Sequence, residues 1–185
     1  MTARENQLSP GELDEVAPGI FYSKRAFVVA DTDIVEFLKE QARTNEVGRA
    51  RVCAHPNAEA EQHDMLIVSH RDTYVAPHRH LSKSESFIVI EGCAKVLIFD
   101  ESGHVDDVFD MGAASSGLPF FYRMPIGTYH SLDIASEVLV FVESTKGPFR
   151  KEDMQSAPWA PSPDLKEAGR EFISSCSADR QDGHV

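Results

Sequence analysis

The chain has 185 residues, a hydrophobic content of 42% and a formal net charge of −12. This composition is typical of one globular domain with terminal extensions. The acidic balance disfavours nucleic acid or an anionic membrane as a partner, because a phosphate-rich surface requires a basic patch and none stands out. The apolar runs are too short to cross a bilayer, and no signal-peptide pattern opens the chain. The three cysteines are widely spaced, so the expected compartment is the reducing cytoplasm.

Residues 1–62 are expected to form an N-terminal arm and a helix that pack on the rest of the chain. Ile20–Tyr22 and Ala26–Val29 each match a short strand. Asp31 supplies an N-cap for a helix over about 32–45, whose apolar residues form a single stripe.

Residues 49–56 show no clear period and are expected to be irregular. Arg49 and Arg51 are interpreted as solvated side chains. His55 precedes a proline and is interpreted as a hydrogen-bonded structural histidine instead of a ligand.

Residues 63–146 carry short apolar runs separated by turn residues. The pattern predicts a mainly β fold, an antiparallel jelly-roll barrel with an N-terminal helix and a C-terminal tail helix. The expected strands are Met65–Val68, Thr73–Val75, Phe87–Ile90, Ala94–Phe99, Val105–Phe109, Phe120–Met124, His130–Leu132 and Val138–Val142.

The run Phe87–Ile90 is apolar at every position, so both faces of that strand should be covered. A second sheet or a second subunit would do this, and we expect a homodimer.

Residues 147–185 form a proline-rich tail that should end in a short helix. The prolines between Ala157 and Pro163 favour an extended chain, and Ser162–Asp164 is a helix start signal. Trp159, the single tryptophan, is expected to pack this tail onto the barrel.

Four metal-capable side chains occur at informative spacings. His78 and His80 would point to the same side of a strand, because side chains alternate along it. A turn-length polar link then precedes Glu85, so a hairpin would fold this carboxylate back towards the two imidazoles. Pro125 and Gly127 mark a tight turn before His130. Three imidazoles and one carboxylate are a typical ligand set for a first-row transition metal.

The first block resembles the cupin signature, which reads His-x-His, four residues, Glu, six residues, Gly, and ends here at Gly92. The segment Pro125–His130 resembles the second cupin motif, Pro-x-Gly-x-x-His. The chain departs from the usual cupin pattern of Gly, Gly and Asn at Asp72, Pro119 and Ile134.

More narrowly, the arrangement resembles the WbuC-type cupin-fold metalloproteins over about Asp31 to Pro161. The stretches that carry this resemblance are Arg51–Pro56, Tyr74–His80, Lys146–Phe149 and Ala157–Pro161. It implies a link to surface-polysaccharide (O-antigen) biosynthesis, with a sugar-derived small molecule as the ligand.

The expected cofactor is one divalent transition-metal ion per chain. The mixed nitrogen and oxygen ligand set suits Fe, Mn, Ni, Co, Cu and Zn and does not select among them. Four protein ligands on an octahedral ion leave open positions for a small molecule, as a metal-dependent isomerase or lyase would need. An Fe(II)-dependent oxygenase and a non-catalytic sensor or assembly module braced by the metal are the alternatives. Tyr74, Arg123 and Tyr129 are the candidate substrate-binding side chains.

Overall fold

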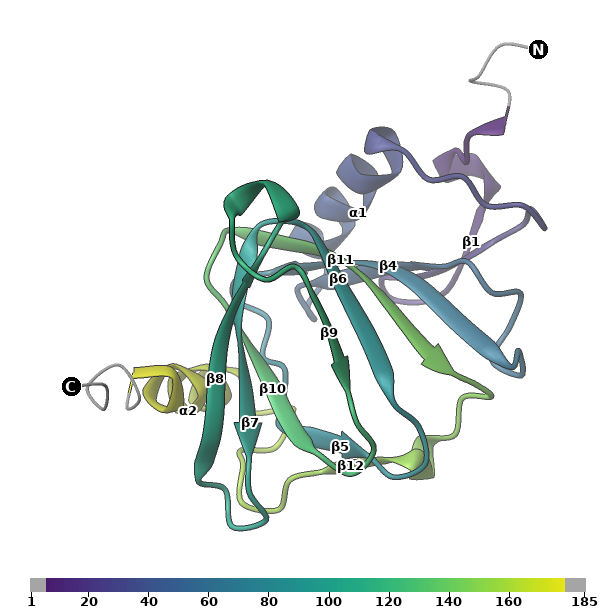
Figure 1. Ribbon diagram of the computed structural model, residues 1–185. Helices are drawn as coiled ribbons and strands as arrows, with labels where there is room; N and C mark the ends of the chain where they lie inside the picture. Colours follow the sequence, from purple (N-terminus) through teal and green to yellow (C-terminus); the bar gives the residue numbers. More distant parts are fainter. Residues whose placement is uncertain (1–5, 179–185) are drawn as a thin grey trace.

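The structure, a computed structural model, describes residues 6–178. Two β-sheets face each other around an apolar interior, and one helix lies against the outer face of each sheet (Figure 1). This is the predicted mainly β jelly roll, with one helix near the N-terminus and one at the C-terminal end.

Seven strands form the larger sheet, in the order β1-β2-β3-β4-β11-β6-β9. Only β2 and β3 pair in parallel, and the other neighbours in this sheet are antiparallel. The strands are β1 (Leu13–Ala17), β2 (Ile20–Ser23), β3 (Arg49–Cys53), β4 (Gln62–His70), β11 (Val138–Lys146), β6 (Glu85–Glu91) and β9 (Phe121–Met124).

Five strands form the smaller sheet, in the order β12-β5-β10-β7-β8, and all of its pairs are antiparallel. They are β12 (Met154–Ser156), β5 (His78–His80), β10 (Tyr129–Ile134), β7 (Cys93–Phe99) and β8 (Val105–Gly112). The short strand β5 therefore lies between two strands that follow it in sequence, and His78 pairs with His130.

The interior is formed by alternate residues of both sheets, as the pleat of a strand requires. Its buried members share this inward parity and include Met65, Ile67, Phe87, Val89, Val96, Leu132, Leu139 and Phe141. The residues that alternate with these point outward. Those of the larger sheet pack against α1, and those of the smaller sheet pack against the C-terminal tail and α2.

The helix α1 (Thr32–Thr44) confirms the helix expected over 32–45. Its N-cap is Asp31, whose carboxylate accepts hydrogen bonds from the backbone N–H of Asp33 at 3.0 Å and of Ile34 at 3.4 Å. Ile34, Leu38 and Ala42 form the buried stripe against the larger sheet. The remaining helices are α2 (Lys166–Ala178) and the short 3₁₀ turns Pro10–Glu12, Ala114–Ser116 and Lys151–Asp153.

The expectation of an irregular segment at 49–56 was wrong for its first half, which is the strand β3. Ala50 and Val52 are buried against α1, while Arg49 and Arg51 occupy the opposite face, towards the interior. Both arginines are partly buried, so they are not the solvated side chains that we expected. Charged residues at the inward positions concealed the alternation of a strand.

Some of the other strand predictions were wrong. Ala26–Val29 and Thr73–Val75 form no strand, whereas β1 and β12 were missed. The expected packing of Trp159 is confirmed, because its ring lies 5.0 Å from that of Phe99 and 5.7 Å from that of Tyr129. The division of the chain at residues 62 and 146 stays a prediction.

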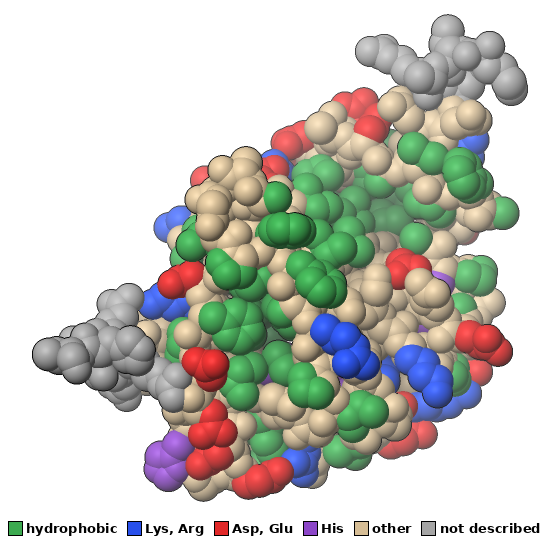
Figure 2. Space-filling model, viewed as in Figure 1, with side chains coloured by type: hydrophobic (Ala, Val, Ile, Leu, Met, Phe, Trp, Pro, Cys, Tyr) green, Lys and Arg blue, Asp and Glu red, His purple; other side chains and the backbone are tan. Residues whose placement is uncertain are grey.

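The outer face of β6 is not covered within the described residues. Ile88 and Ile90 are 42% and 48% exposed, so a second layer over both faces of this strand is absent from the described part of this single chain. Figure 2 shows apolar side chains gathered on the face that β6 and β9 present.

The turn from β6 to β7 depends on Gly92, the last residue of the His-x-His block. Its φ is +84°, a left-handed conformation that favours glycine. A Cβ at this position would collide with the carbonyl oxygen of Val138 and the hydroxyl of Ser136.

We expect Gly92→Ala to lower the free energy of unfolding by more than about 2 kcal/mol, because it adds a steric clash to the backbone strain. Gly117→Ala is the matched control, since Gly117 has a φ of +80° but nothing within 4 Å of the added Cβ. It should cost only about 1 kcal/mol. Urea denaturation of the metal-free variants measures both values, and equal losses would contradict the role of the close approach.

Candidate metal centre

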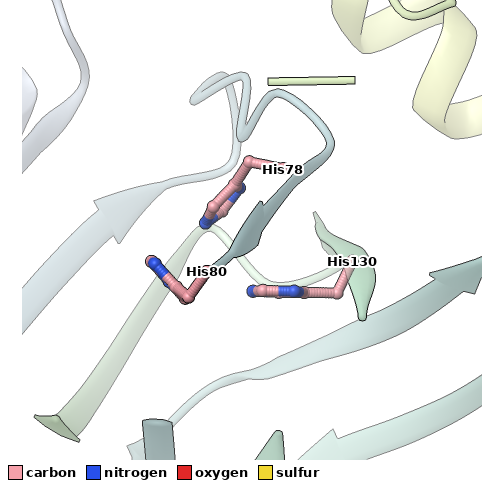
Figure 3. Close-up of side chains that lie close together, drawn as sticks. All are labelled: His78, His80 and His130. Atoms are coloured by element: carbon pink, nitrogen blue, oxygen red, sulfur yellow. The ribbon is translucent and has the colours of Figure 1, made fainter. Parts of the chain in front are cut away.

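The three imidazoles of the candidate centre come together where β5 lies beside β10. His78 and His80 are two residues apart on β5, and His130 lies opposite His78 in the ladder. One ligand atom from each ring lies within 4.8 Å of the other two (Figure 3). The spacing argument from the sequence therefore placed these three side chains correctly.

Glu85 reaches the same place from the other sheet, at the first residue of β6. Its Oε2 lies 3.0 Å from Nε2 of His80, and its Oε1 lies 3.1 Å from Nε2 of His130. The carboxylate is only 5% exposed. It lies against His80 and His130 and bridges these two rings.

Backbone carbonyls hold two of the rings in defined orientations. Nδ1 of His78 lies 2.9 Å from the carbonyl oxygen of Ala76, and Nδ1 of His130 lies 2.9 Å from that of Thr128. A carbonyl oxygen can only accept, so both Nδ1 atoms carry the proton and donate it. This is the usual second contact of a metal-binding histidine, and it leaves Nε2 as the ligand atom.

The charge states of these groups differ although they are neighbours. Burial and the adjacent His130 ring lower the pKa of His78 to about 3, so this imidazole is neutral at physiological pH. Burial also disfavours the charged form of His130, but the hydrogen bond and negative charge of Glu85 outweigh it and raise the pKa of His130. The hydrogen bonds from His130 and His80 likewise overcome burial and hold the pKa of Glu85 well below its ordinary range.

The raised pKa of His130 favours its charged form, an imidazolium paired with the carboxylate of Glu85. Its Nδ1 donates to Thr128, and its Nε2 donates to Glu85. A divalent cation could take the place of the Nε2 proton, because it satisfies the same carboxylate and needs the same lone pair.

The residues present fit a divalent transition-metal ion. Three imidazoles and a carboxylate converge in a buried site, two of the rings are oriented by backbone contacts, and Nδ1 of His80 is buried without a hydrogen-bond partner. An ion would engage the His80 ring, which the described residues leave only partly satisfied.

The three candidate substrate-binding side chains lie elsewhere. Tyr74 donates from its hydroxyl to the carbonyl oxygen of Pro161 at 2.8 Å and packs between the smaller sheet and α2. Tyr129 is buried in the same outer cluster, beneath the guanidinium of Arg79 at 4.4 Å. Arg123 is exposed and donates to the hydroxyl of Ser84 at 3.0 Å. Substrate binding by these three residues stays a prediction, and their positions outside the histidine cluster do not favour it.

Sequence reasoning missed a second group of polar side chains on the interior wall of the larger sheet. Glu143 on β11 pairs with Met65 on one side and Phe87 on the other, both of which belong to the interior. Burial and the negative charge of Glu85 raise the pKa of Glu143 to about 7. The feature that could have revealed this group is a charged residue, Glu143, at an inward-facing position of β11. That position is recognised as inward-facing only once the register of the strand is known.

The order of the strands in the two sheets and the position of the histidine cluster between them identify the architecture. This is a double-stranded β-helix of the cupin type. The model of one family, a domain of unknown function called DUF6016, matches residues 30–111, less than half of the chain. That segment contains His78, His80 and Glu85 but ends before His130. No curated protein matches this cupin-type chain.

Solved structures with a similar fold are only distantly related in sequence. A variant of oxalate decarboxylase from Bacillus subtilis is 22% identical with a TM-score of 0.43, and the match covers 52% of this chain. An uncharacterised protein with a double-stranded β-helix domain from Klebsiella pneumoniae is 15% identical with a TM-score of 0.45, covering 59% of this chain and 79% of that one. CapF bound to the inhibitor 3-isopropenyl-tropolone is 14% identical over 58% of this chain, with a TM-score of 0.45.

The chain spans only 24% of the oxalate decarboxylase and 30% of CapF. At these identities and scores, the likenesses carry no argument about activity. The fold itself is evident from the strand order and pairing described above.

We expect His80→Ala to lower the affinity for Zn²⁺ by more than about 100-fold, because even the loss of an outer partner of a ligand costs about 10–100-fold. His104→Ala is the control, since the His104 side chain is 84% exposed on a turn far along the chain from the cluster. Elemental analysis and competition with a chromogenic chelator measure the two affinities. Equal metal content in the two variants would contradict the assignment of His80.

We expect metal binding to release at least one proton, because the Nε2 proton of His130 must leave. Affinity should therefore fall as the pH is lowered from about 8 to about 6, the range in which imidazoles take up protons. Glu85→Gln should weaken binding at the upper end of this range through loss of the negative charge. Because the pKa of His130 is raised by Glu85, the variant should also show a shallower fall in affinity with decreasing pH.

Calorimetric titration of Zn²⁺ in buffers of different ionisation enthalpy gives both the affinity and the number of protons released. Circular dichroism of each variant checks that the fold is intact. The same affinity and proton release in wild type and Glu85→Gln would place Glu85 outside the metal site.

Proposed function

We propose that this chain is a cupin-type metalloprotein that holds one divalent transition-metal ion and acts on, or binds, a small molecule beside it. The observation that carries the proposal is the convergence of His78, His80 and His130 around the buried carboxylate of Glu85. A lone histidine is commonly structural, but three rings held together with a carboxylate form a ligand set.

The protein's own residues would contribute position, charge and exclusion of water. The contacts to Ala76 and Thr128 hold two imidazoles with Nε2 turned towards the cluster. Glu85 supplies one negative charge against a divalent ion, and the apolar interior lowers the effective dielectric around it. When bound, such an ion supplies Lewis acidity and open coordination positions for a small molecule.

The finer proposal for the ligand is a sugar-derived molecule linked to surface-polysaccharide (O-antigen) synthesis. It is supported by the resemblance to the WbuC-type proteins in the stretches around Tyr74–His80 and Ala157–Pro161. We also propose that the protein is a cytoplasmic homodimer without nucleic-acid or membrane partners. The exposed apolar side chains of β6 and β9 support the dimer, and no helix in the described range is long and apolar enough to span a membrane.

The three functional hypotheses, an isomerase or lyase, an oxygenase and a module braced by the metal, predict different effects of exchanging the metal ion. We expect protein purified without added metal to contain about one first-row divalent ion per chain, from the ligand set. For an isomerase or lyase, exchanging that ion should change turnover of a sugar-derived or carbonyl substrate without oxygen uptake. Oxygen consumption that depends on Fe(II) would instead assign an oxygenase.

The control for this experiment is His80→Ala, which should lose both the metal and the metal-dependent activity. If exchange of the ion changes only the thermal midpoint and leaves small-molecule binding unaffected, the metal braces the fold. That result would contradict the enzymatic readings and support the sensor or assembly module.

A further inference from the structure

The interior wall of the larger sheet carries two arginines that the metal site does not explain. Arg49 and Arg51 lie on the inward face of β3, in register with Ser69 and Ile67 of β4. Cys53 continues the same face and belongs to the buried interior cluster. The guanidinium groups therefore project from a wall whose neighbouring side chains are mainly apolar.

Neither arginine has an ion-pair partner within residues 6–178. Nε of Arg51 is buried without a hydrogen-bond partner. Arg51 interacts electrostatically with Tyr22, Cys53 and Glu143, and its hydrogen-bonding contact is to the Cys53 thiol. Arg49 and Arg51 are two residues apart on β3 and therefore share one face of the sheet, and burial and the like charge of Arg51 lower the pKa of Arg49.

Glu143 connects this pair to the candidate metal centre. It pairs with Phe87 of β6, while Glu85 pairs with Thr145, so the two carboxylates are diagonal neighbours on one face of the sheet. Glu143 interacts electrostatically with Arg49 and Arg51 on one side and with Glu85 and His80 on the other. The arginines and the histidine cluster therefore belong to one polar region of the interior.

Two partly buried guanidinium groups that share a single carboxylate, that of Glu143, are costly for a protein to maintain. A buried charge is destabilising unless a counter-charge and hydrogen bonds compensate it, and a guanidinium cannot lose its proton to become neutral. A structural role would normally provide one carboxylate for each cation, whereas here Glu143 alone faces both. A bound anionic ligand would supply the missing negative charge and so explain why both cations are present.

We propose that Arg49 and Arg51 bind the carboxylate of a small organic acid, whose remaining part extends past Glu143 to the metal centre. This inference rests on the proposed function, because it names the chemical class of the molecule that the centre would receive. Glu143 would face the uncharged part of that molecule and could hydrogen-bond a hydroxyl there.

A carboxylate suits this wall better than a phosphate. The planar fork of a guanidinium matches the two oxygens of a carboxylate, and one such group carries a single negative charge. Glu143 already stands against the two cations, so the uncompensated positive charge is smaller than a dianion would require.

The first test is the stability of the ligand-free protein. Arg51→Met keeps an unbranched side chain but removes a desolvated cation next to another cation. Its thermal midpoint should equal or exceed that of the wild type, because the charge contributes nothing until a ligand is bound. A clear decrease in the midpoint would show that Arg51 has a structural role and would overturn the proposal.

The second test is calorimetric binding of malonate, with inorganic phosphate as the comparison, to Zn²⁺-loaded protein whose metal content is measured before and after. Arg51→Met should weaken malonate binding at least tenfold, about the loss of one charged hydrogen bond. Arg51→Lys should show an intermediate loss, because it keeps the charge but not the fork. The matched control is Arg43→Met, since Arg43 is an exposed residue of α1 paired with Glu40; it should bind malonate like the wild type.

Failure of wild type to bind malonate, or equal binding by wild type and Arg51→Met, would overturn the proposal. Tighter binding of phosphate than of malonate would overturn the assignment of a carboxylate. The metal function is judged separately. If the protein holds no metal yet binds malonate in a manner that depends on Arg51, the metal centre fails and the anion site stands; if metal binds and malonate does not, the reverse holds.

Discussion

The carboxylate of Glu85 is the contact on which the candidate site depends, because it joins the two sheets at the histidine cluster. Glu85 begins β6 in the seven-stranded sheet, whereas its partners His80 and His130 belong to β5 and β10 of the five-stranded sheet. A buried carboxylate is stable there only because two imidazole N–H groups satisfy it. The raised pKa of His130 favours a proton on its Nε2, at the position where a divalent cation would bind.

The interior of the barrel is divided between an apolar region and a polar one. Towards β7 and β8 the wall consists of apolar residues such as Val96 and Met111. Towards β3 and β11 it carries Arg51 and Glu143 among apolar neighbours. Stability alone would favour an apolar residue at each of these positions, and the proposed anion site would account for their charges.

The outer faces of the sheets show how the rest of the chain supports this interior. The α1 stripe covers β3 and β4, and Trp159 with α2 covers β7 and β10. The strand β12 belongs to the tail and pairs with β5 through Met154–His80 and Ser156–His78, so the tail braces the strand that carries two of the histidines. The segment that seemed peripheral in the sequence thus helps to fix the site.

The sequence determined those features that depend on neighbours in the chain. The N-cap at Asp31 and its apolar stripe specify a helix, and His78, His80 and Glu85 lie close enough in sequence for a strand and a turn to bring them together. Tertiary structure alone decided which distant side chains share the interior. Tyr74 was a candidate substrate-binding residue close to His78 in the sequence, but residues 73–77 form no strand, so the alternation of side chains along β5 does not extend back to it. Arg49, Arg51 and Glu143 face the centre because β3, β4 and β11 pair in one register, and a register between distant strands depends on how their apolar faces pack.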